Sequence, residues 1–221
     1  MQFTDKTLTV LKNFAAINPS LAFSAGSTVR TMNPHKTVIA IADVDTEFPG
    51  EAVVYDMSRF LATLGLYTKP EVEFGKKAFV ISEGRRRNTY VYADKSMIIS
   101  APEKDPKFPA GDVEVKVEWN DLQAVLKASS VLQLPEVAFV GEEGKVYLRA
   151  IDSKNPTADQ FGVELGDTAD TFTLIIKTEN LKLLPQNYEV TLSGKGISRF
   201  AGDGVRYYVA IEKDSSYNKG A

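Results

Sequence analysis

A unit of about fifty residues recurs four times along this 221-residue chain, and the repeat constrains the fold more than any other feature. The clearest copy begins at Val113–Trp119, where every second side chain is apolar, as in a half-buried strand. Asn120–Asp121 can cap a helix, and apolar residues then recur at helical spacing as far as Val131. Pro135 is expected to end this helix, before a hairpin over 137–149. Because one such unit cannot bury its apolar face alone, the copies must stack on one another.

The other three copies follow the same order, although the first starts with its helix. Cap-type residues and prolines predict where these helices begin and end. The expected caps are Thr4–Asp5, Asp56 and Thr178–Asn180, and the expected stops are Pro19, Pro70 and Pro185.

Residues 101–112 contain three prolines and a glycine and break both periodicities, which is typical of a linker. Two copies of the repeat lie on each side of this linker. The sequence therefore predicts an α+β protein of two similar domains, each with two helices packed on antiparallel sheets. The expected boundaries are 1–104 for the first domain, 105–112 for the connector and 113–221 for the second domain.

The composition excludes several classes of function. The chain has no cysteine and a single histidine, His35, so a cysteine-ligated zinc site and a histidine relay are excluded. No Ser/His/Asp set or pair of carboxylates converges in the pattern, and we expect neither enzymatic activity nor a cofactor or metal. No apolar run is long enough to span a membrane, and Met1–Asp5 has no signal-peptide pattern, which indicates a cytoplasmic start.

Basic residues occupy the polar faces of the four expected helices, whereas acidic residues sit mainly at the helix starts. Two interpretations remain open: solvated helix faces, or one shared basic surface in a chain whose net charge is -3. The basic residues concerned are Lys6, Lys12, Arg59, Lys127 and Lys182. Arg85–Arg87 forms a further basic run at an expected hairpin tip, either solvated or in contact with DNA or a partner.

Two apolar segments, 97–99 and 161–165, are expected to be strands at the end of each domain's strand series. Exposed edges of this kind recruit partners, and a head-to-tail contact between them closes into a ring when the rotation permits. Burial within the chain is the alternative. The candidate interface residues are Met97, Ile98, Ile99, Phe161, Val163 and Leu165.

The chain resembles the sliding clamps of DNA polymerases, most closely those of T-even-type bacteriophages. The resemblance spans the whole length and rests on an ordered set of short matches. These matches are Leu11–Ala15 with Ile17–Asn18, Tyr55–Asp56 with Phe60–Leu61, Asp121–Gln123 with Val125–Leu126, Asn187–Tyr188 and Tyr207–Glu212.

The resemblance implies the DNA clamp fold and a homotrimeric ring of six domains whose helices surround duplex DNA. It also implies that the ring tethers the replicative polymerase, is opened by an ATP-driven clamp loader and activates late transcription, in the cytoplasm of the infected bacterium. The five helix cations would then line the pore. Partner peptides would bind an apolar pocket drawn from Met32, His35, Val38, Phe108, Tyr208, Ala210 and Ile211. The alternative function is a non-enzymatic interaction module that does not thread DNA.

Overall fold

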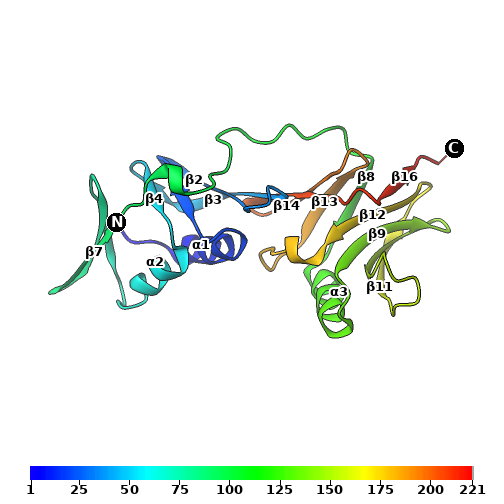
Figure 1. Cartoon of the computed structure of the whole chain (residues 1–221), viewed down its shortest axis with the longest axis horizontal. Helices are drawn as coiled ribbons and strands as arrows, with labels where there is room; N and C mark the ends of the chain where they lie inside the picture. The colour runs from blue at the N-terminus through cyan, green and yellow to red at the C-terminus, as the bar shows by residue number, and fades with distance from the viewer. Residues whose placement is uncertain (221) are drawn as a thin grey trace. The chain divides into compact units, whose positions relative to one another are not determined.

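The structure, a computed structural model, describes residues 1–220. The chain divides into two compact units, of which the first spans Met1–Asp105 and the second begins at Pro106. Each unit consists of antiparallel strands with helices packed against them (Figure 1). The predicted α+β class with antiparallel sheets is therefore confirmed. Within the described residues, no helix combines the length and the apolar character that crossing a membrane requires.

Two helices, α1 (Asp5–Ile17) and α2 (Met57–Leu64), lie side by side against the strands of the first unit (Figure 1). Thr4 caps α1, because its hydroxyl accepts a hydrogen bond of 3.1 Å from the amide of Thr7. Asp56 caps α2 in the same way, with a carboxylate oxygen 2.8 Å from the amide of Arg59. Both helices begin where the cap residues predicted.

The strands of the first unit pair as local hairpins and one short ladder. β2 pairs with β3, β1 with β4, and β5, β6 and β7 form a three-stranded sheet in that order. Their bounds are β1 (Leu21–Phe23), β2 (Gly26–Met32), β3 (Val38–Phe48), β4 (Ala52–Val54), β5 (Glu71–Phe74), β6 (Ala78–Glu83) and β7 (Arg86–Val91). A single 3₁₀ turn, η1 (Lys95–Met97), follows β7.

An aromatic cluster fills the core of the first unit. The ring of Phe79 lies 4.8 Å from that of Phe60 and 4.7 Å from that of Phe74, centroid to centroid. Phe23 packs on Phe48 at 4.9 Å. Because α2, β3, β5 and β6 each contribute a ring, this cluster joins α2 to the strands.

The second unit contains one α-helix, α3 (Trp119–Leu132), which packs against β9, β10 and β11. Its strands form a five-stranded sheet in the order β11-β10-β9-β12-β16, and a second ladder in the order β15-β14-β13-β8. Their bounds are β8 (Val113–Val117), β9 (Glu136–Glu142), β10 (Lys145–Ile151), β11 (Phe161–Asp167), β12 (Thr171–Lys177), β13 (Tyr188–Ser193), β14 (Ile197–Gly202), β15 (Val205–Ala210) and β16 (Ser216–Asn218).

The start of α3 differs from the prediction. The helix begins at Trp119, ahead of the expected cap at Asn120–Asp121, and the residue at its cap position, Glu118, makes no capping bond with its side chain. Asn187 supplies the missing acceptor, because its side-chain oxygen lies 2.8 Å from the amide of Trp119. A cap provided from another part of the chain has no local sequence signal.

The predicted fourth helix is wrong. Only a three-residue 3₁₀ turn, η2 (Thr178–Asn180), forms after β12, and the following residues up to Pro185 form neither helix nor strand. The physical reason is length: just four residues separate Asn180 from Pro185, and the proline cannot continue a helix. The leucines there are buried all the same, with Leu181 5% and Leu183 8% exposed.

Two tyrosines hold the segment that replaces this helix. The hydroxyl of Tyr188 donates to the carbonyl oxygen of Leu184 at 2.5 Å, and the amide of Leu184 donates to the hydroxyl of Tyr207 at 3.1 Å. Burial raises the pKa of Tyr188 to about 12 and raises the pKa of Tyr207 further. Both phenols are therefore neutral hydrogen-bonding groups of the core.

The aromatic cluster provides a direct test of packing in the first unit. Phe79 is fully buried among rings, and Phe79→Ala should lower the free energy of unfolding by about 3–5 kcal/mol, because it leaves a cavity. Urea denaturation measures this loss. Leu66→Ala is the control, since Leu66 is 65% exposed and its removal should change stability by less than about 0.5 kcal/mol. Equal losses for the two variants would contradict the assigned core.

Candidate functional site

Two cations of the first unit lie on the exposed sides of its helices. Lys12 on α1 and Arg59 on α2 are exposed, and neither makes an ion pair with any residue that the structure describes. Lys6, at the start of α1, differs from them because its amine lies 3.2 Å from a carboxylate oxygen of Asp45. The charge of Lys6 is therefore partly neutralised within the chain.

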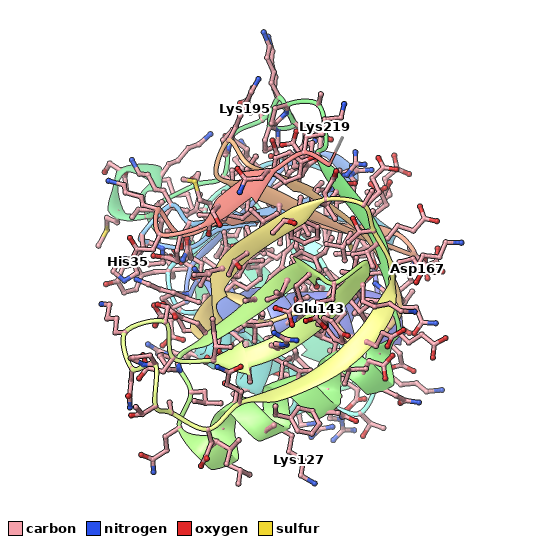
Figure 2. The ribbon with its side chains drawn as sticks, turned by 90° about the vertical axis from the view of Figure 1, so that its right-hand side faces the viewer. His35, Lys127, Glu143, Asp167, Lys195 and Lys219 are labelled. Atoms are coloured by element: carbon pink, nitrogen blue, oxygen red, sulfur yellow. The ribbon has the colours of Figure 1, made fainter. Side chains whose placement is uncertain are left out.

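In the second unit, Lys127 projects from α3 away from the strands (Figure 2). Lys182 is exposed too, but it lies on the irregular segment after η2 and not on a helix. The helical placement predicted for Lys182 is thus wrong, for the reason given above for the fourth helix. Four of the five predicted cations do lie on helices, and their convergence on one surface stays a prediction.

The seven residues of the predicted pocket come from both units. In the first unit, Met32 and Val38 flank the turn that carries the exposed His35 (Figure 2). Asn33 closes this turn, because its side-chain oxygen accepts from the amides of Thr37 at 2.8 Å and Val38 at 2.9 Å. Whether these three residues share a pocket with those of the second unit stays a prediction.

In the second unit, the connector contacts the strand that carries the other pocket residues. The ring of Phe108 lies 6.3 Å from that of Tyr208 on β15, which ends at Ala210, and Ile211 follows directly after the strand. The guanidinium of Arg199 on β14 lies over the ring of Phe108, 5.3 Å from its centroid. Arg199 has no distinguishing sequence signal, and it was not predicted.

The segment 97–99 is not a strand, which corrects the prediction for Met97, Ile98 and Ile99. Met97 ends η1, and the residues after it form no ladder. Asn18 explains this conformation: its amide nitrogen donates to the carbonyls of Ile99 at 3.0 Å and Met32 at 2.7 Å. The side chains of Met97 and Ile99 are 62% and 38% exposed, and their role as interface residues stays a prediction.

The other predicted edge strand is confirmed. Phe161, Val163 and Leu165 lie on β11, which, among the described strands, pairs with β10 alone and forms one edge of its sheet. An open edge of the first unit is β7, which pairs with β6 alone within residues 1–220 and was not predicted as an edge. The sequence pattern of the β6–β7 hairpin does not show which of its two strands lacks a second neighbour.

The surroundings of these two edges differ in shape. Beside β7 lies a cleft of about 370 Å³ lined by α2 and β7, with Tyr55, Arg59 and Tyr90 among its residues. Beside β11, the end of α3 carries Val131, which is 72% exposed, and Leu132, which is 37% exposed. Val131 was predicted to face the core, but it lies in the last turn of α3 and is open to solvent.

Among residues 1–220, no group of three or more histidine, aspartate or glutamate side chains is arranged to hold a metal ion.

Two units of antiparallel strands with helices packed against them are the arrangement of the DNA clamp fold, and the solved structures that the chain resembles have this fold. The chain is similar in structure to the PCNA2–PCNA3 complex of Sulfolobus tokodaii, with a TM-score of 0.67 over 96% of this chain and 99% of that chain, at 13% identity. It is equally similar to the DNA polymerase III beta subunit of Pseudomonas aeruginosa, with a TM-score of 0.67 over 96% of this chain and 65% of that one.

The sequence assigns the chain more narrowly. Residues 112–213 match the family described as "gp45 sliding clamp, C terminal". The chain is 36% identical to the sliding clamp of Vibrio phage KVP40, over 96% of this chain and 99% of that clamp. It is 29% identical to the sliding clamp of Enterobacteria phage T4, over 99% of this chain and the whole of that clamp. The chain belongs to the sliding clamp family of T4-like bacteriophages.

The role of Asn18 in placing segment 97–99 gives a prediction. Asn18→Ala should lower the free energy of unfolding by about 1–2 kcal/mol, because two partly buried carbonyls lose their donor. It should also speed proteolytic cleavage between residues 95 and 105. Ser20→Ala is the matched control, since it removes a bond to the oxygen of Asn18 and keeps both donors. Cleavage of Asn18→Ala at the rate of the control would contradict this role.

Proposed function

We propose that this protein is a sliding clamp, a closed ring around duplex DNA that tethers the replicative polymerase for processive synthesis. The observation that carries the proposal is the 36% identity, along nearly the whole of both chains, to a phage sliding clamp. The clamp fold is consistent with it. The protein acts in this proposal as a scaffold without catalysis.

The charges of the chain suit a ring that slides. A topological link needs no tight phosphate contact, and sliding requires contacts that are weak and independent of sequence. Exposed cations such as Lys12, Arg59 and Lys127 supply that attraction from the helices. The net charge of -3 disfavours DNA bound to the outside. We assign these three residues to the pore, together with Lys182 and, more weakly because of Asp45, Lys6.

We further propose that three copies join head to tail, with β7 of one copy pairing with β11 of the next. Each strand has one unpaired edge, which is what an added strand requires. Exposed apolar side chains accompany β11, namely Phe161 on the strand itself and Val131 and Leu132 on α3, and the cleft beside β7, whose lining includes Tyr55 and Tyr90, offers them a concave surface. A heterologous contact of this kind closes into a ring when the rotation permits.

The polymerase is proposed to bind the apolar pocket that includes Phe108 and Tyr208. The family of the chain supports two further proposals: opening of the ring by an ATP-driven clamp loader, and a role as coactivator of late transcription. All these activities would take place in the cytoplasm of the infected host.

The alternative is a protein-interaction module that does not thread DNA. The experiment that separates the two uses a clamp loader with ATP and two DNA substrates of equal sequence. A threaded ring stays on nicked circular duplex and is lost from the same duplex after linearisation, because it slides off the ends. Equal retention on both substrates, or on neither, would reject the clamp.

The pore assignment predicts the effect of reversing two charges. Lys12→Glu with Lys127→Glu should reduce the amount of loaded clamp by about tenfold or more, because repulsion replaces attraction at each helix. Thermal unfolding should remain that of the wild type, since both side chains are exposed. Loading is measured by gel filtration of clamp on nicked circles.

The matched control for this variant is Lys76→Glu with Lys195→Glu. It carries the same change in net charge, again with one residue in each unit, but both lysines lie in hairpin turns. Lys195 lies at the opposite end of the second unit from Lys127 (Figure 2). Equal loss of loading in both variants would remove Lys12 and Lys127 from the pore.

The pocket predicts a separate effect. Tyr208→Ala should weaken polymerase binding by about thirtyfold, because a buried aromatic anchor is lost. Tyr208→Phe keeps the ring beside Phe108 and should bind as the wild type does. Surface plasmon resonance with the polymerase measures both, and the oligomer should be unchanged. Full binding by Tyr208→Ala would exclude this residue from the pocket.

A further inference from the structure

The basic run Arg85–Arg87 consists of three residues in different surroundings. Arg86 turns toward the rest of its unit, where its guanidinium pairs with Glu83 and lies 5.3 Å from the ring centroid of Tyr67. Arg87 is the next residue on β7 and so points to the other face of the sheet. Arg85 is in the turn between β6 and β7 and is exposed to solvent. Only Arg86 has an ion-pair partner among the described residues.

A rigid corner forms where this turn meets the loop after α2. A carboxylate oxygen of Glu83 accepts hydrogen bonds from the amides of Lys69 at 2.6 Å and Thr68 at 3.1 Å. Arg86 donates to the carbonyl of Leu66 at 3.1 Å. The bond from the Lys69 amide, together with the charge of Arg86, lowers the pKa of Glu83, so the carboxylate stays ionised at neutral pH.

The corner is continuous with the surface formed by the two helices of the first unit. The loop begins directly after α2, whose C-cap is Gly65. Lys69 in this loop and Lys12 on α1 both line a cleft of about 450 Å³, together with Leu61 and Leu64 of α2. Lys69 is exposed, and within the described residues its amine has no carboxylate partner. The cations of the helices therefore continue past the end of α2.

The C-terminus of α2 is an unfavourable place for an anion unless cations lie beside it. A helix C-terminus carries a partial negative charge, and α2 has no basic residue in its last turn. An anionic polymer that passed along α2 would be repelled at this end. Lys69 and Arg85 offset that repulsion, and the hydrogen bonds of Glu83 and Arg86 fix the backbone that carries them.

We propose that Lys69 and Arg85 form a second contact with the sugar-phosphate backbone of duplex DNA, at the mouth of the ring where the duplex leaves the pore. The proposal rests on the proposed clamp function, since it takes α2 as a pore helix. The contact is with phosphates and carries no sequence preference. Arg87 and Lys76, at the opposite face and the opposite end of the same sheet, do not take part.

The absence of cysteine from the chain allows a proximity test. R85C, R87C and K76C are each labelled with the same short photoactivatable cross-linker, and each clamp is loaded on nicked circular duplex by a clamp loader with ATP. The label at position 85 should cross-link to DNA, and the labels at 87 and 76 should not. Equal yields at 85 and 87 would overturn the proposal. If neither the wild type nor any of the three labelled variants stayed on nicked circular duplex, the clamp function itself would be rejected.

A charge test uses the clamp without a loader and a short linear duplex, onto whose open ends a ring can thread. K69Q with R85Q should make the salt dependence of binding to a short linear duplex shallower by about 1 for each lost phosphate contact, whereas K76Q with R87Q should leave the slope unchanged. Fluorescence anisotropy across a potassium chloride series measures both slopes. An unchanged slope for K69Q with R85Q would overturn the proposal. If that variant also bound the polymerase or the clamp loader less well, the corner would be assigned to a protein partner instead of DNA.

Discussion

Backbone hydrogen bonding at two strand edges is the constraint on which the proposed assembly depends. β7 and β11 each pair with a neighbour on one side only, and unpaired amide and carbonyl groups favour the addition of another strand. The residues beside the edges are not alike: a cleft accompanies β7, and the exposed Val131 and Phe161 accompany β11. Two different surfaces can satisfy each other only between copies placed head to tail, and that arrangement allows a ring.

A ring changes what the charges have to achieve. A protein that holds DNA by contact alone needs many phosphate contacts, and it then moves slowly along the duplex. A topological link removes that need, so a few exposed cations on the helices, in a chain of net charge -3, are sufficient. The partial pairing of Lys6 with Asp45 is consistent with this weak attraction. In the same way, the corner formed by Glu83 and Arg86 adds only two free cations beyond the end of α2.

The sequence predicted those features whose causes are local. Thr4 and Asp56 cap their helices through bonds to residues three positions later, and so their positions could be deduced from spacing. Features with distant causes were missed. The start of α3 depends on Asn187, the conformation of segment 97–99 depends on Asn18, and the position of Phe108 involves Arg199. The prediction of a fourth helix is wrong because the leucines after Asn180 have helical spacing, but the segment before Pro185 is too short to form a helix.

The functional residues, too, could be predicted where their placement has a local cause and not where it depends on distant residues. Exposed cations on predicted helices could be identified one helix at a time, because polar faces follow from periodicity. The open edge of β7 could not, since a hairpin sequence does not reveal which strand lacks a second neighbour. The sequence likewise does not distinguish the three arginines of the run Arg85–Arg87, because the contacts of Arg86 are with Leu66 and Tyr67 in the loop after α2.

The most direct test of the account is the mass of the protein in solution over a wide range of concentrations, measured by light scattering. Pairing of β7 with β11 between copies predicts a species close to three times 24.3 kDa at high concentration, which dissociates on dilution. A protein that remains at 24.3 kDa at every concentration would contradict the ring, and with it the explanation of the exposed edges and of the sparse charges on the helices.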